Sequence, residues 1–202
     1  ETTKQGNLLL KGDNYESNIQ SSKPEEFPVI SGVSERKEAV SVDSAVLREG
    51  LTRAVIASEV SDLRPEISGV LLLGEINVLK LVATDSFRLA EVRISGQQFK
   101  NNLGEGFKFT IPLKTAQELT RILKDEGKAS FYTEKNQFLF KTEDTTLTSR
   151  LIEGPFPDYE AIIPKEIDTE VLVSRNELSG ALKLSGAFAS RTHDVRLKLK
   201  DK

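Results

Sequence analysis

Two segments of ten residues in this chain match each other in the spacing of a valine and two leucine residues, and this repeat constrains the possible folds more than any other feature of the sequence. Residues 42–51 align without a gap on residues 173–182, an offset of 131 positions. Two amphipathic helices could agree by chance, but the same dipeptide precedes both copies, as Phe27-Pro28 and Phe156-Pro157. Duplicated segments indicate a repeated supersecondary unit. We therefore expect a fold built from copies of one unit.

The first copy is predicted to be a strand that leads into a helix. Residues 39–42 form a short strand candidate, and Asp43 or Ser44 is a suitable N-cap for a helix that runs to about Ser58. In the second copy, Ser174 and Glu177 have the spacing of a capping box. The apolar positions of the first helix define one stripe, made of Val46, Leu47, Gly50, Leu51, Ala54 and Val55.

A finer repeat lies inside the middle of the chain. Leu51-Thr52-Arg53 in the first helix is echoed by Leu119-Thr120-Arg121 in a second predicted helix. This helix should begin at Pro112, because proline suits a first helical turn, and end at Gly127 after about Glu126. Its expected inward stripe is Leu113, Ala116, Thr120 and Leu123.

Short β-branched or alternating runs separated by turn residues predict many strands. Residues 7–11 and 15–19 flank Gly12-Asp13-Asn14, which is typical of a hairpin turn. Residues 97–106 are expected to be a polar loop. The remaining strands are expected at 71–73, 78–82, 89–94, 107–111, 129–133, 137–142 and 145–152.

A polar corner separates two of the central strands. Thr84-Asp85-Ser86 follows one strand, and Asp or Ser at such a corner can hydrogen-bond the local backbone and hold a turn. Phe87 and Arg88 come next, so a rigid strand end should present an aromatic ring and a guanidinium group. The same residues are also compatible with a tight turn that has no other role.

The composition excludes several classes of function. There is no cysteine, no apolar run of the length that spans a membrane and no signal peptide, so a cytoplasmic protein is expected. We expect no catalytic group, metal site or cofactor, since His193 stands alone in a polar run and no phosphate-binding loop occurs. The net charge of −3 means that any DNA contact needs a local basic face. The lack of methionine indicates a piece of a longer protein.

Three motifs occur in succession along the chain: Arg64-Pro65-Glu66-Ile67-Ser68-Gly69-Val70-Leu71-Leu72, then Val82-Ala83-Thr84-Asp85-Ser86-Phe87-Arg88-Leu89-Ala90, then Gly154-Pro155-Phe156-Pro157-Asp158-Tyr159. In their order and approximate spacing they resemble the bacterial sliding clamp family, the β subunit of DNA polymerase III. The resemblance implies an α+β DNA clamp fold. In it, each domain duplicates a strand–helix–strands unit, with antiparallel sheets outside and two helices on the inner face.

The repeat and the resemblance together predict three domain segments. Residues 1–36 would be the C-terminal part of clamp domain 1, residues 37–165 the complete, central domain 2, and residues 166–202 the N-terminal part of domain 3. In the family, the inner helices face the phosphates of duplex DNA. The residues expected to do so here are Lys114, Arg121, Lys124, Arg48 and Arg53.

The resemblance also implies a groove for short partner peptides. Some family members have Gly-His where this chain has Ser86-Phe87, and Ala161 replaces a basic residue, so the peptide preference is expected to differ. Taken singly, Ile67, Leu89 and Ile162 could equally be core residues. The matching positions are Ile67, Thr84, Ser86, Phe87, Arg88 and Leu89 on one wall, with Pro157, Ala161 and Ile162 on the other.

The function implied by the resemblance is that of a non-catalytic processivity factor in DNA replication. The full-length protein would close as a homodimeric ring around duplex DNA, without reading its sequence. Its protein partners would be the polymerase III catalytic subunit, the clamp loader and repair polymerases. Two alternatives remain: a peptide-binding adaptor that does not encircle DNA, and an enzyme whose catalytic residues lie outside this chain.

Overall fold

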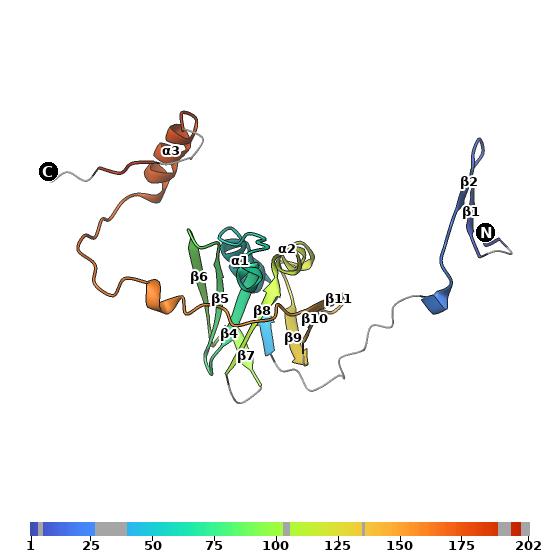
Figure 1. Cartoon of the computed structure of the whole chain (residues 1–202), viewed down its shortest axis with the longest axis horizontal. Helices are drawn as coiled ribbons and strands as arrows, with labels where there is room; N and C mark the ends of the chain where they lie inside the picture. The colour runs from blue at the N-terminus through green and yellow to red at the C-terminus, as the bar shows by residue number, and fades with distance from the viewer. Residues whose placement is uncertain (4–5, 27–39, 103–105, 135, 190–194, 199–202) are drawn as a thin grey trace. The chain divides into compact units, whose positions relative to one another are not determined.

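The computed structural model describes residues 1–3, 6–26, 40–102, 106–134, 136–189 and 195–198 (Figure 1). The chain divides into two compact units, residues 1–157 and residues 158–202. The Phe27-Pro28 pair and the loop around His193 lie outside the described residues. The boundaries of the three predicted domain segments stay a prediction.

The N-terminal residues form the predicted hairpin. β1 (Leu8–Lys11) pairs antiparallel with β2 (Glu16–Ile19), and Lys11 lies opposite Glu16. The turn closes with a hydrogen bond of 2.9 Å from the Gly12 backbone N–H to the Tyr15 carbonyl. A short 3₁₀ turn, η1 (Pro24–Glu26), follows the hairpin.

Two antiparallel sheets make up the centre of the first unit. The five-stranded sheet has the order β11-β10-β9-β3-β7, and the four-stranded sheet has the order β6-β5-β4-β8. The strands are β3 (Val40–Asp43), β4 (Gly69–Gly74), β5 (Val78–Thr84), β6 (Leu89–Ser95), β7 (Phe99–Asn101), β8 (Phe107–Pro112), β9 (Lys128–Glu134), β10 (Gln137–Lys141) and β11 (Thr146–Arg150).

The order of the strands reveals two interlocked halves. The first half runs β3–α1–β4–β5–β6 and the second runs β8–α2–β9–β10–β11, with α1 at Ser44–Val55 and α2 at Leu113–Ile122. However, β3 pairs with β9 of the second half, and β8 pairs with β4 of the first. Each half therefore gives its first strand to the sheet of the other, and the duplicated strand–helix–strands unit is confirmed.

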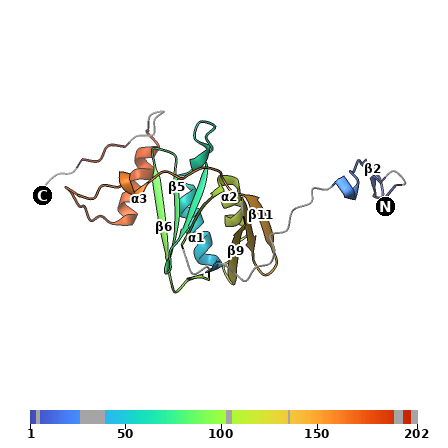
Figure 2. The same ribbon diagram turned by 60° about the horizontal axis from the view of Figure 1, so that its bottom comes forward.

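The helices α1 and α2 contact each other and pack on the sheets (Figures 1 and 2). The predicted stripe of α1 is confirmed at its centre, because Leu47, Leu51 and Ala54 are all buried. Gly50 brings α1 close to the sheet: a Cβ atom there would lie 2.8 Å from Cδ1 of Leu81 on β5. A larger residue at this position would require the Leu81 side chain to shift.

An aromatic cluster fills the core of the second half. Phe131, Phe138 and Phe140 on β9 and β10 are buried completely. Phe107 and Phe109 on β8 join them, with neighbouring ring centroids 5.4–6.5 Å apart. Burial of such rings stabilises a domain by about 3–5 kcal/mol each when judged by truncation to alanine. The donated strand β8 is thus held by its side chains as well as by its backbone.

Alternation along the strands gives the four-stranded sheet two different faces. Val92 and Ile94 of β6 pack toward Gly50 of α1, so Glu91 and Arg93 must point to the opposite face. On β8, Phe107 and Phe109 point to the core, and the side chain of Lys108 is exposed. We call the side that carries α1 and α2 the helix face and the other side the outer face.

Three expectations about this part of the chain were wrong. Helix α2 ends at Ile122 rather than near Glu126, because Leu123 takes an extended conformation and is buried. Thr120, which was expected on the inward stripe of α2, is only half-buried, and its neighbour Leu119 is buried instead. The expected polar loop at 97–106 contains β7, which pairs with β3.

The second unit contains the 3₁₀ turn η3 (Glu160–Ile162) and the helix α3 (Arg175–Gly186). Both boundaries of α3 keep the offset of the sequence repeat, because 175 − 44 and 186 − 55 both equal 131. The predicted cap is present, with the Ser174 hydroxyl accepting a hydrogen bond from the backbone N–H of Glu177. None of the residues of α3 is buried.

Candidate functional site

Helices α1 and α2 carry four of the five basic residues expected to face DNA. Lys114 and Arg121 lie on α2, and Arg48 and Arg53 lie on α1. Lys114, Arg53 and Arg121 are exposed, whereas Arg48 is half-buried. The fifth residue, Lys124, is exposed but lies beyond the end of α2. Because the two helices are in contact, the structure places these charges on one face of the domain.

Most of these cations form ion pairs with carboxylates of the same chain. Both carboxylate oxygens of Glu118 accept hydrogen bonds of 3.0 Å from Nη1 of Arg121, one helical turn away. Glu118 therefore places a carboxylate among the basic residues of α2. The other two pairs of the helices are Arg48 with Asp125 and Arg53 with Glu49.

Lys124 forms the fourth pair, with Asp144 of the turn between β10 and β11. Its Nζ lies 2.5 Å from Oδ2 of Asp144, and the hydroxyls of Thr142 and Thr145 donate to Oδ1 of the same carboxylate. The hydrogen bond from Lys124, followed by those from the two hydroxyl groups, lowers the pKa of Asp144 to about 2. The same bond raises the pKa of Lys124, so both groups are charged near neutral pH.

Lys114 differs from the other four. Lys114 is the second residue of α2, which begins directly after Pro112. It borders a hollow that Asp62 and Glu153 also line. Yet it forms no ion pair with any residue that the structure describes. Of the five expected cations, it is therefore the one that no described carboxylate holds in a direct ion pair.

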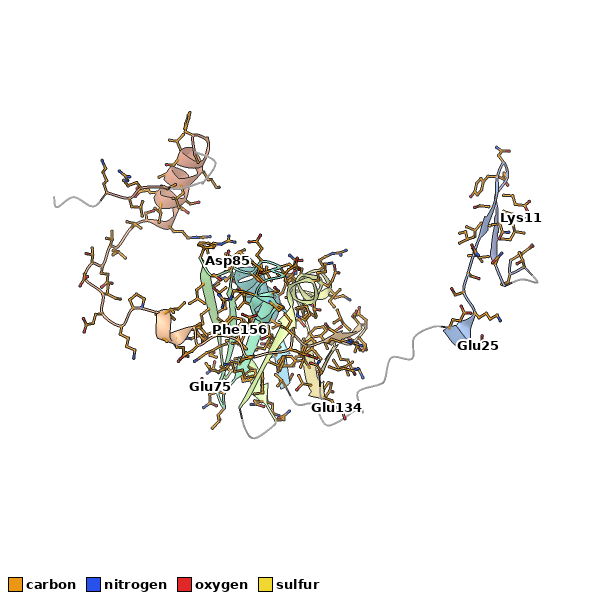
Figure 3. All side chains as sticks on the ribbon, in the orientation of Figure 1. Lys11, Glu25, Glu75, Asp85, Glu134 and Phe156 are labelled. Carbon is orange, nitrogen blue, oxygen red and sulfur yellow. The ribbon has the colours of Figure 1, made fainter. Side chains whose placement is uncertain are left out.

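The corner after β5 is held by Asp85 (Figure 3). Oδ1 of Asp85 accepts hydrogen bonds from the backbone N–H groups of Phe87, at 3.0 Å, and Arg88, at 2.7 Å. The Thr84 hydroxyl donates to the Arg88 carbonyl at 2.7 Å, which closes the turn from the other side. The prediction that Asp85 holds this turn is confirmed, but the hydroxyl that supports it belongs to Thr84 and not to Ser86.

The carboxylate of Asp85 also binds the side chain of Arg88. Nε and Nη2 of Arg88 lie 2.8 Å and 2.7 Å from Oδ2 of Asp85. Donation by the Arg88 backbone N–H, followed by these side-chain contacts, holds the pKa of Asp85 at about 2. The guanidinium charge of Arg88 is therefore already paired before any partner arrives.

Phe87 projects from this fixed turn with 96% of its surface exposed. Ser86, just before it, has a backbone φ of 77°, in the left-handed region that favours glycine. The Ser86 hydroxyl accepts a hydrogen bond of 2.9 Å from Nη1 of Arg64, a contact that the sequence did not predict. A rigid backbone thus presents a large apolar ring to solvent.

The other expected groove residues differ in exposure. Thr84 and Leu89 lie opposite each other in the pairing of β5 and β6, on the outer face of the sheet. Leu89 is half-buried, as is Pro157, whereas Ile67 is buried like a core residue. Ala161 and Ile162 belong to the second unit, where both are exposed. Their place opposite the first wall stays a prediction.

The sequence analysis missed the four carboxylates that pair with the basic residues. Glu49 and Glu118 could have been found from their spacing to Arg53 and Arg121, since residues three or four apart on a helix are neighbours. Asp125 and Asp144 gave no such signal. They meet Arg48 and Lys124 across 77 and 20 residues of sequence, through the packing of the domain.

Within the described part of the chain, no group of three or more His, Cys, Asp or Glu side chains is arranged to hold a metal ion. The described helices are also too short or too polar to cross a membrane. The arrangement that remains is a helix face with basic residues and an outer-face turn that presents an aromatic ring.

This arrangement of interlocked halves under two helices defines a domain of the sliding clamp class. The sliding clamp of Bacillus subtilis superimposes with a TM-score of 0.85 at 26% identity, over 95% of this chain and 50% of that chain. A Pseudomonas aeruginosa clamp solved with griselimycin bound gives a TM-score of 0.76 at 27% identity, over 92% and 49%. Among curated relatives, the beta sliding clamp of Staphylococcus aureus is 28% identical over 199 residues, 98% of this chain and 52% of its own.

The family itself follows from a separate match. Residues 41–158 match the family described as the DNA polymerase III beta subunit, central domain. The chain belongs to this family. It spans about half the length of the curated relatives that it matches.

Proposed function

We propose that this chain is part of a sliding clamp that encircles duplex DNA and tethers the replicative polymerase. The observation that carries the proposal is the central-domain match over residues 41–158, on a fold whose two adjacent helices carry basic residues. Residues 1–36 and 166–202 are then the adjoining parts of clamp domains 1 and 3, and residues 37–165 are domain 2. The full-length protein acts as a ring-shaped homodimer in the bacterial cytoplasm.

The contact with DNA in this proposal is weak and independent of sequence. Phosphate contacts from Lys and Arg supply affinity but carry no base information. Few such contacts suit sliding, because affinity grows steeply with the number of neutralised phosphates. Retention then comes from enclosure by the ring. A protein with a net charge of −3 can hold DNA in this way.

Lys114 provides the test of the helix face. In the full-length protein loaded on nicked circular DNA, Lys114→Glu should shorten the retention time, and Lys114→Glu with Arg121→Glu should shorten it further. The matched control is Lys108→Glu, which makes the same charge change on the outer face. Linearising the DNA should release wild type and control alike. Equal retention of Lys114→Glu and Lys108→Glu would remove the helix face from the proposal.

The partners in this proposal dock through short peptides at the turn after β5. Phe87 and Leu89 form its apolar wall, and Thr84, Ser86 and Arg88 fix its shape. Ile67 and Pro157 complete this side of the proposed groove. Ala161 and Ile162 are proposed to form the other side. Exposed aromatic side chains on a fixed backbone are typical anchors of such contacts. The peptides come from the polymerase III catalytic subunit, the clamp loader and repair polymerases. The clamp itself is non-catalytic and needs no cofactor.

A second candidate function is a peptide-binding adaptor that never encloses DNA. The exposure of Phe87 favours it equally, because the turn after β5 does not depend on the helix face. The two functions differ in their response to DNA topology. An adaptor would be retained equally on circular and linear DNA, or on neither, whereas a clamp would remain on circles and leave linear ends.

A further inference from the structure

Carboxylates of the chain itself neutralise nearly all of the basic residues proposed to face DNA. Four of the five cations are paired, and the fifth, Lys114, has no such partner among the residues that the structure describes. The four pairs are Arg48 with Asp125, Arg53 with Glu49, Arg121 with Glu118, and Lys124 with Asp144. Each pair places a negative charge next to the cation that a phosphate would approach.

A paired cation attracts DNA much less than a free one. In 0.1 M salt the Debye length is about 10 Å. At that distance, two opposite charges about 3 Å apart act as a nearly neutral group. At closer range the carboxylate repels the phosphate that the cation attracts. Before contact, the long-range attraction of this face therefore depends mainly on Lys114.

These pairs are also easy to open. The side chains of Arg121 and Glu118 are 75% and 51% exposed, and those of Lys124 and Asp144 are 70% and 51% exposed. Exposed pairs contribute little to stability, so a phosphate oxygen can replace the carboxylate without disturbing the fold. The cation then exchanges one anionic partner for another.

We propose that Glu49, Glu118, Asp125 and Asp144 compete with DNA phosphates for the basic residues of the helix face. This inference rests on the proposed clamp function. By competing, the carboxylates keep the contact weak enough for the ring to slide. They act as tuning residues of the DNA interface, although none of them binds DNA.

The same exchange lowers the sensitivity of binding to salt. When a free cation meets a phosphate, DNA releases about 0.9 of a counterion. When a paired cation does so, the carboxylate left behind attracts a cation from solution, and part of that release is cancelled. Removing the carboxylate should therefore raise the affinity for duplex DNA. It should also make the logarithm of the affinity fall more steeply with the logarithm of the salt concentration.

Glu118→Gln tests the proposal with little change in shape. In the full-length protein, its affinity for a fluorescent 30-base-pair duplex should rise roughly three- to tenfold at 50 mM salt, and the slope should steepen by up to about 0.9. Adding Asp144→Asn should increase both again. The matched control is Glu91→Gln, which breaks the pair with Arg93 on the outer face and makes the same change in net charge.

The outcomes separate this proposal from the clamp function itself. A gain for Glu118→Gln that Glu91→Gln does not share supports the competition. Equal gains would show a bulk effect of net charge, and no gain would show that the carboxylate does not compete; either result overturns the proposal. If Lys114→Glu still lowers affinity in those cases, the helix face meets DNA and only the competition fails. If Lys114→Glu has no effect either, the DNA role of the face fails as well.

Discussion

The helix face and the turn after β5 both contain paired charges, but the pairs have opposite surroundings. On the helix face, Asp144 keeps 51% of its side chain exposed, and its cationic partner is a long, exposed lysine. At the turn, the side chain of Asp85 is only 7% exposed and binds two backbone N–H groups as well as Arg88. The comparison separates pairs that can open for a partner from a pair that fixes the backbone.

This difference matches the two kinds of partner that we propose. A duplex that slides through the ring needs cations that release its phosphates quickly. Cations that can return to an exposed carboxylate partner meet this need. A docked peptide needs a surface that does not move, and a carboxylate bound to the backbone provides that. The two faces of one domain can therefore carry a mobile contact and a rigid one.

The largest effect is expected at the apolar end of the rigid turn. In the full-length protein, Leu89→Asp or Phe87→Ala should weaken binding of a clamp-binding peptide from the polymerase III catalytic subunit by about 30-fold or more, the loss typical of a binding hot spot. Isothermal titration calorimetry would measure it. Lys108→Glu on the same face serves as a control and should leave the affinity unchanged. Full peptide affinity in both groove variants would contradict the assignment of this wall.

The next effect concerns the stability that Asp85 supplies. Asp85→Ala removes the acceptor for two backbone N–H groups and should lower the free energy of unfolding by about 1–3 kcal/mol at pH 7. Urea denaturation of the chain would measure it. Asp144→Ala should shift the urea midpoint much less, because its carboxylate lies in solvent. Equal shifts would remove the distinction between the two regions.

The pH dependence tests the contribution of the Asp85 charge to stability. The folded pKa of Asp85, about 2, is lower than the ordinary value near 3.9, so its charge stabilises the fold above pH 4. That contribution is lost as the pH falls from 4 through 2. The stability gap between wild type and Asp85→Ala should therefore narrow over this range. A gap that stays constant from pH 7 to pH 2 would show that the charge of Asp85 has no part in it.

The smallest effect is expected at Ser86. A left-handed backbone costs a non-glycine residue about 1–2 kcal/mol. Glycine avoids this strain, but it loses more conformational entropy on folding, so only part of the cost is recovered. Ser86→Gly should therefore stabilise the chain by about 0.5 kcal/mol despite the loss of the hydrogen bond to Arg64. Ser86→Ala loses the same bond and keeps the strain, so it should be less stable than wild type. Thermal unfolding would rank the three, and a Ser86→Gly variant less stable than Ser86→Ala would contradict the strain.

Much of the fold could be predicted because local patterns and the repeat agree. The stripe around Leu47 and Leu51, the hairpin at Gly12 and the alternation in β6 all follow from spacing along the chain. The same holds for the corner at Asp85, whose hydrogen-bond partners are its own neighbours in sequence. Such features need no knowledge of the tertiary structure.

The remaining features depend on contacts between distant segments. Leu123 leaves helix α2 in an extended conformation and still reaches the core, which propensity alone does not indicate. The three residues of β7 become a strand only because β3 is beside them. Likewise, Arg48 meets Asp125 only after the two halves have packed together. For this reason, the sequence indicates the basic residues of the two helices but not the ion pairs of Arg48 and Lys124.

The exchange of β3 and β8 between the two halves has a consequence for how the domain assembles. Neither half holds a complete sheet of its own, so neither is expected to fold alone. The folded domain requires both halves together. Two separate polypeptides, divided between β7 and β8, should therefore remain unstructured apart and gain structure on mixing. Any change that weakens one half would be felt throughout the domain, since each is completed by the other.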